Sequence, residues 1–148
     1  EPPRKKFAPI IDRQMKAIII VKTVVENSIL FSIFVYFWKT TNDISLARTL
    51  VFVGFGIGAL FYIFSIRSMR RMVWRVNPFQ NVYLVLAVVL SWILLIAGVY
   101  WRPLQILLHT VPLNASHWFI MIIFGMVNLL VFEVIKGLFI LNHKKINI

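Results

Sequence analysis

The chain has 148 residues, of which 60% are hydrophobic and 14% are charged, and its formal net charge is +11. A soluble domain carries about 25% charged residues, so this composition indicates a protein that resides in a membrane. The absence of cysteine excludes disulfide bonds and thiolate metal sites. The basic residues flank apolar blocks, and no separate basic stripe carries stacking aromatic rings. The expected partner is therefore the lipid bilayer and not nucleic acid.

Residues 1–17 form a basic lead-in that begins with the letters EPPRKKFAPI. This lead-in lacks the charged, apolar and cleavage regions of a secretory signal peptide. Because the first residue is Glu1 and not methionine, we expect the chain to be a segment cut or processed from a longer protein.

Four apolar blocks follow, and each is long enough to cross a bilayer, which takes about 20 residues of helix. They lie near residues 18–38, 47–66, 82–101 and 118–140, and residues 141–148 form a tail. The blocks are continuous apolar runs and not the alternating segments of a membrane barrel. The sequence therefore predicts an all-α membrane protein, built as a bundle of four transmembrane helices.

Lysine and arginine are divided unevenly between the two sides that these spans define. Eleven of them precede span one, lie between spans two and three, or follow span four. The other side carries three, which are Lys39, Arg48 and Arg102. Because loops rich in Lys and Arg stay on the cytoplasmic side, both termini and the short tail are predicted to be cytoplasmic.

Residues 102–117 form the outside-facing connection between spans three and four. Tyr100, Trp101 and Trp118, at its two ends, predict an aromatic belt at the depth of the lipid headgroups. Pro103 is expected to end a helix and to stiffen the connection. The apolar middle, residues 104–111, is expected to lie along the membrane surface as a short amphipathic turn.

Charged residues inside the spans carry the most information, because their burial is costly and indicates function by default. Lys22 precedes Glu26 by one helical turn in span one, so the two side chains can pair within the helix. In span four, Lys136 follows Glu133 by three residues and can pair with it in the same way. One interpretation is that these structural polar pairs satisfy each other near the cytoplasmic boundary.

A second interpretation is that polar groups of spans one and four line a cation path. The candidate ion ligands are then Glu26, Asn27 and Asn128.

The letters GFGIG in span two resemble a nucleotide-binding loop only superficially, because they lie inside an apolar block where no phosphate belongs. Gly54 and Gly58 are four residues apart on one helical face, and we interpret them as a site of close helix packing. No set of residues in the chain forms a catalytic site or a cofactor-binding site that we can identify.

Four segments, taken in order, resemble the carboxy-terminal membrane region of P-type cation-transporting ATPases. They are ARTLVF, LFYIFSIRSMRR, WRPLQILLHTVPLNASHW and FEVIK, and the opening EPPR is similar to a segment that follows the sixth membrane helix in that family. The resemblance covers nearly the whole chain. Its most specific part is the string that runs from Pro103 to Trp118.

The resemblance implies that the chain comprises membrane helices seven to ten of a pump that couples ATP hydrolysis to cation movement. It also implies that ATP and Mg²⁺ bind elsewhere in that parent, because the family's Asp-Lys-Thr-Gly phosphorylation motif is absent here. Some calcium pumps carry an ion ligand midway along the eighth helix. The matching stretch, 58–60, has no such side chain, which leaves the transported ion open.

The sequence is thus interpreted as the support domain of an ATP-driven cation pump in a prokaryotic plasma membrane. It would complete the ion-transport domain without being catalytic alone, and its partners would be the remaining membrane helices and cytoplasmic domains of the pump. One alternative is a self-standing small four-helix transporter or channel that uses Glu26 or Glu133 as its coupling carboxylate. The other alternative is an accessory membrane subunit of a separate pump.

Overall fold

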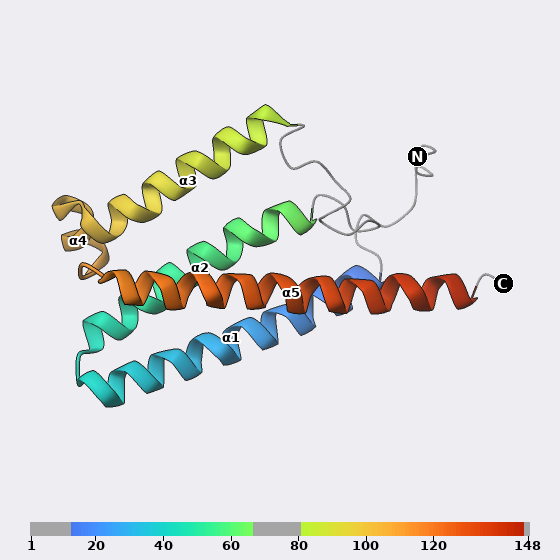
Figure 1. Cartoon of the computed structure of the whole chain (residues 1–148), viewed down its shortest axis with the longest axis horizontal. Helices are drawn as coiled ribbons and strands as arrows, with labels where there is room; N and C mark the ends of the chain where they lie inside the picture. Colours follow the sequence, from blue (N-terminus) through green and yellow to red (C-terminus); the bar gives the residue numbers. More distant parts are fainter. Residues whose placement is uncertain (1–12, 67–80, 147–148) are drawn as a thin grey trace.

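Five helices make up most of the chain between residues 13–66 and 81–146, which are the residues that the computed structural model describes (Figure 1). The helices are α1 (Arg13–Thr41), α2 (Ile44–Ile66), α3 (Val82–Tyr100), α4 (Arg102–Leu108) and α5 (Ala115–Ile146). These residues contain no strand, and the predicted all-α class is confirmed.

Four of the five helices are long and apolar enough to cross a membrane, which confirms the four predicted spans. The crossing segments are Ile19–Thr41, Ile44–Ile63, Val82–Tyr100 and Ala115–Ile135. The start of α1 and the end of α5 lie at the same end of the bundle (Figure 1). The basic segments 1–12 and 67–80 lie outside the described residues, and the cytoplasmic placement of both termini stays a prediction.

Helix α2 is the centre of the bundle and packs against α1, α3 and α5. Its residues Leu50, Val53 and Ile57 are buried together with Leu95 of α3 and Met121 of α5. Helix α3 contacts α2 through Leu95, which lies beside Gly56, and it diverges from α5 away from the α4 end (Figure 1). The core of the domain is therefore centred on α2, whose most extensive packing is against α1 and α5.

A tight turn joins α1 to α2. Asn42 adopts a left-handed backbone conformation with φ of 53°, which an asparagine tolerates better than most residues. Its backbone N–H donates to the carbonyl of Trp38 at 3.0 Å. The Asp43 carboxylate then accepts from the backbone N–H groups of Ser45 and Leu46, as a helix N-cap does. Because of this cap, α2 begins at Ile44, ahead of the expected start at residue 47.

The connection between α3 and α5 is held to the bundle by side-chain hydrogen bonds. The Tyr100 hydroxyl donates to the carbonyl of Leu113 at 2.6 Å and accepts from Trp118 Nε1 at 2.8 Å. The Thr110 hydroxyl donates to the carbonyl of Gly98 at 2.5 Å. Tyr100 and Trp118 therefore hold the two ends of the connection together.

Pro103 lies three residues after the end of α3 at Tyr100, which agrees with the expected helix end. It also lies in the first turn of α4. A proline is well tolerated there, because the first turn of a helix leaves its backbone N–H groups without intrahelical partners.

Two glycines of α2 lie where α1 and α5 come close. A side chain at Gly54 would collide with Leu30 of α1 and would lie 3.6 Å from the Met121 sulfur of α5. A side chain at Gly58 would collide with the Glu26 carboxylate of α1. Both glycines are buried, so the row of small residues gives the three helices their close approach.

We expect the double variant Gly54→Leu/Gly58→Leu to disrupt the packing of α2 against α1 and α5. Overpacking costs about 1–3 kcal/mol at a well-packed site, so two sites on one interface should lower stability strongly. The measurement is unfolding of the purified chain in detergent by heat or denaturant. Ala59→Leu is the matched control, because Ala59 is an exposed residue of the same helix and should tolerate the larger side chain. Equal stability of the double variant and the control would contradict the packing argument.

Candidate functional site

Glu26 lies at the centre of a buried polar cluster inside the bundle. Its side chain projects from α1 toward α5, and the residue is only 5% exposed. One carboxylate oxygen, Oε1, accepts a hydrogen bond of 2.8 Å from Asn128 Nδ2 of α5. The other oxygen, Oε2, pairs with the ammonium group of Lys22. The cluster thus joins the first and the last helix of the chain through one side chain.

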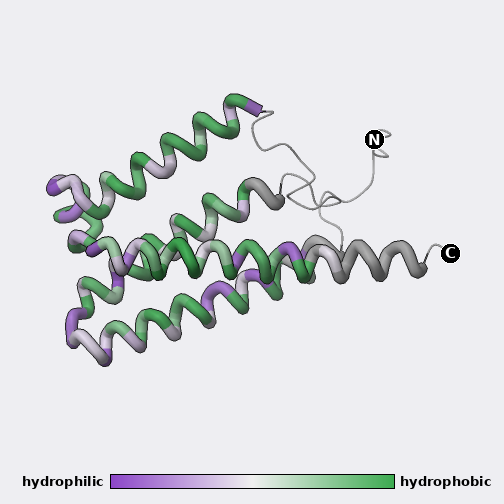
Figure 2. The backbone as a smooth tube through the Cα atoms, viewed as in Figure 1, coloured by the Kyte–Doolittle hydropathy of each residue, from purple (hydrophilic) through white to green (hydrophobic). Residues whose placement is uncertain are grey.

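The backbone positions these groups in a simple way. Lys22 and Glu26 are one helical turn apart, so both lie on the same face of α1. Gly58 of α2 faces that position, and its missing side chain leaves the space that the Glu26 carboxylate occupies. Hydrophilic segments interrupt the apolar runs of α1 and α5 in Figure 2, and the bond from Asn128 to Glu26 connects the two helices there.

An aromatic residue completes the surroundings of Lys22. The ammonium nitrogen lies 4.5 Å from the centre of the Tyr62 ring of α2, within the range of a cation–π interaction. The Tyr62 ring in turn packs edge-to-face on Phe132 of α5, with 4.7 Å between ring centres. The positive charge therefore lies between a carboxylate and a ring face, both of which favour it in a medium of low polarity.

Asn27 does not join this cluster. It is exposed, and its Nδ2 donates to the carbonyl of Thr23, one turn back along α1, at 2.7 Å. Together with Ser28, Phe31 and Phe55 it lines a groove of about 570 Å³ between α1 and α2. The structure therefore brings two of the three candidate ligands together and places the third on a different face.

The second predicted pair is described only in part. Glu133 of α5 is buried, with 1% of its surface exposed. The side chain of Lys136 lies outside the described residues, so the pairing of Glu133 with Lys136 stays a prediction.

Each oxygen of the Glu26 carboxylate has a protein partner in this arrangement, Asn128 for Oε1 and Lys22 for Oε2. Among the described residues, every buried side-chain nitrogen and oxygen has a hydrogen-bond partner. A paired and fully hydrogen-bonded carboxylate is the form in which a charge survives burial, because losing either partner leaves an uncompensated group. The cluster is a polar link between α1 and α5, and Lys22 supplies the positive charge beside the Glu26 carboxylate.

The fold and the cluster define a helical membrane domain whose spans are joined by an internal polar link. The chain belongs to the family described as "Cation transporting ATPase, C-terminus", whose model matches residues 1–138. The sequence-based resemblance to P-type cation-transporting ATPases is thereby confirmed.

Known relatives agree with this assignment. The chain is 35% identical over 99 residues to a calcium-transporting ATPase of Bacillus subtilis, an alignment that covers 67% of the chain and 11% of the relative. It is 28% identical over 120 residues to a probable cation-transporting ATPase F of Mycobacterium bovis, which covers 79% of the chain and 13% of the relative. The same values hold for a relative of that name from Mycobacterium tuberculosis.

The chain therefore spans about a tenth of the length of these relatives. Its four apolar helices and its bacterial relatives support an integral membrane protein of the prokaryotic plasma membrane, as expected.

The link between Glu26 and Asn128 can be measured with a double-mutant cycle of Glu26→Ala and Asn128→Ala. Both changes are made in a Lys22→Met background, so that no unpaired ammonium group remains. Hydrogen bonds between membrane helices couple by about 0.6 kcal/mol on average and by at most about 1.7 kcal/mol. We expect a coupling energy in this range from unfolding in detergent.

The control cycle pairs Asn27→Ala with Asn128→Ala in the same background. Because Asn27 bonds to its own helix, the two changes should be additive. A coupling for Glu26 and Asn128 that is no larger than this control would show that the bond contributes nothing to stability.

Proposed function

We propose that the chain is the carboxy-terminal support domain of an ATP-driven cation pump. The remainder of that pump would bind ATP and Mg²⁺, form the phosphorylated intermediate and carry most of the ion ligands. The four helices would complete the membrane domain and hold its outer helices in place. The family match and the small share of each relative that the chain covers support this proposal.

The observation that carries the proposed supporting role is that both carboxylate oxygens of Glu26 have protein partners. A carboxylate that serves as an ion ligand needs an oxygen directed at the ion. Here Oε1 accepts from Asn128 and Oε2 from Lys22. An ammonium group beside the carboxylate would also repel a second cation. We therefore assign Glu26 and Asn128 to structural cohesion and not to the ion path.

The change Glu26→Gln tests this assignment in the full-length protein. Gln keeps an oxygen that can accept from Asn128 but removes the charge that pairs with Lys22. We expect a loss of stability of about 3–5 kcal/mol, because the change leaves the Lys22 ammonium group without its charge partner. The ion concentration that gives half-maximal ATPase activity should stay unchanged. Asn27→Ala is the matched control, because it removes a polar group from the same helix outside the cluster.

A clear shift in that ion concentration, at unchanged stability, would overturn the structural role. The cluster would then contribute to the cation path.

The division of labour within the pump gives a second expectation. The full-length protein should form a covalent acyl-phosphate with ATP and hydrolyse ATP in a cation-dependent manner, whereas the 148-residue chain alone should do neither. The measurement is incorporation of labelled phosphate into purified protein. Acyl-phosphate on the isolated chain would contradict the proposal, and so would a full-length protein that never incorporates phosphate.

A further inference from the structure

Helix α4 exposes most of its apolar side chains and turns the amide of Gln105 inward. Leu107 is 73% exposed, Ile106 is 69% exposed and Trp101, which precedes the helix, is 59% exposed. Gln105, by contrast, is half-buried, and its Nε2 donates to the carbonyl of Val99 at 2.6 Å. In a loop surrounded by water, the apolar side chains would face the protein and the amide would face the solvent.

The orientation of α4 is held by several independent bonds. Gln105 binds the last turn of α3, the Thr110 hydroxyl binds Gly98, and the backbone N–H of Val111 donates to the Thr49 hydroxyl of α2 at 3.0 Å. Leu108 packs toward Gly98 on the inner side. The outward direction of the apolar side chains is thus a built feature of the connection, fixed to two membrane-crossing helices.

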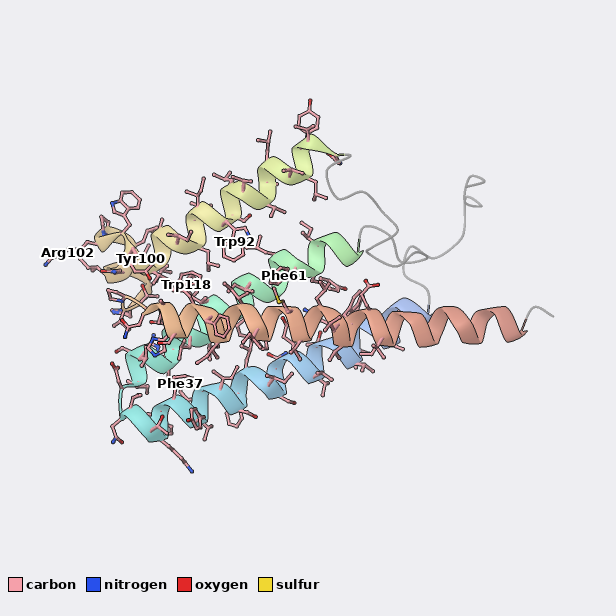
Figure 3. All side chains as sticks on the ribbon, in the orientation of Figure 1. Phe37, Phe61, Trp92, Tyr100, Arg102 and Trp118 are labelled. Atoms are coloured by element: carbon pink, nitrogen blue, oxygen red, sulfur yellow. The ribbon has the colours of Figure 1, made fainter. Side chains whose placement is uncertain are left out.

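The surface around this apolar patch indicates what covers it. The patch starts at Trp101, directly after the last residue of α3, whose outer face is itself apolar and exposed at Ile93 and Leu94. Figure 3 shows Arg102 at the far end of the molecule, pointing away from the crossing helices, where it can reach lipid phosphates. Tyr100 and Trp118 stack at the same end, with 6.5 Å between ring centres. Aromatic and cationic residues in this order are typical of a membrane interface.

We propose that α4 is an interfacial membrane anchor. In this proposal Trp101, Ile106 and Leu107 insert into the phospholipid leaflet at the α4 end of the bundle. The patch on α4 directly follows the lipid-facing surface of α3, so that the connection between α3 and α5 lies within the leaflet and not above it. This inference depends on the membrane-spanning fold and is independent of the transported ion and of ATP hydrolysis.

Because the chain contains no cysteine, a single Leu107→Cys variant of the whole chain carries a unique site for a nitroxide spin label. The labelled protein is reconstituted in vesicles of phosphatidylcholine and phosphatidylglycerol. Collisions of the label with oxygen, which concentrates in the acyl chains, are compared with collisions with a nickel chelate, which stays in water. Leu94→Cys gives the lipid reference, and Asn42→Cys, in the exposed turn between the crossing segments of α1 and α2, gives the water reference.

We expect the ratio of oxygen to nickel accessibility at Leu107 to be several-fold higher than at Asn42 and close to that at Leu94. Ile106→Cys should repeat the result. A ratio like that of Asn42 would overturn the proposal by placing α4 in water. Protection of the label from both reagents would overturn it by showing that protein covers the patch. Spin–spin broadening that grows with the protein-to-lipid ratio would overturn it in favour of a second copy of the chain.

Discussion

A carboxylate inside the hydrocarbon core must receive all of its hydrogen bonds from the protein, and this requirement organises the bundle. Glu26 meets it with one partner from its own helix, Lys22, and one from the last helix, Asn128. The bond from Asn128 requires α1 and α5 to come close. It also requires that α2 has no side chain at Gly58, because a side chain there would collide with the Glu26 carboxylate. The polar link and the glycine face are therefore two parts of one packing arrangement.

The α4 end of the bundle is held by hydrogen bonds from side chains to backbone carbonyls. There the chain passes from α3 through α4 to α5, and carbonyl groups at the end of α3 and ahead of α5 need donors near the lipid headgroups. The hydroxyls of Tyr100 and Thr110 and the amide of Gln105 supply them. The helices are thus linked in one place by a hydrogen bond from the Asn128 amide to the Glu26 carboxylate, and in the other by neutral bonds from side chains to the backbone.

Much of this fold could be predicted from the sequence, because bilayer thickness sets the length of each apolar run and helical periodicity brings Lys22 next to Glu26. The meeting of Glu26 with Asn128 could not be predicted, since it depends on how far each helix is rotated and how deep it lies. For the same reason, Tyr62 was missed as a partner of Lys22. Asn27 could have been separated from Glu26 by geometry alone, because successive residues of a helix point about 100° apart.

Glu26 and Asn128 are 102 positions apart in the sequence, and this separation has a consequence for biogenesis. Helix α1 is synthesised and enters the bilayer long before α5 exists, so Glu26 must be tolerated there without its cross-helix donor. Lys22 leaves the ribosome with it and lies within pairing distance as soon as the first turns form. The local ion pair therefore lowers the free-energy cost of inserting α1 into the membrane until α5 is inserted and Asn128 can donate to Glu26.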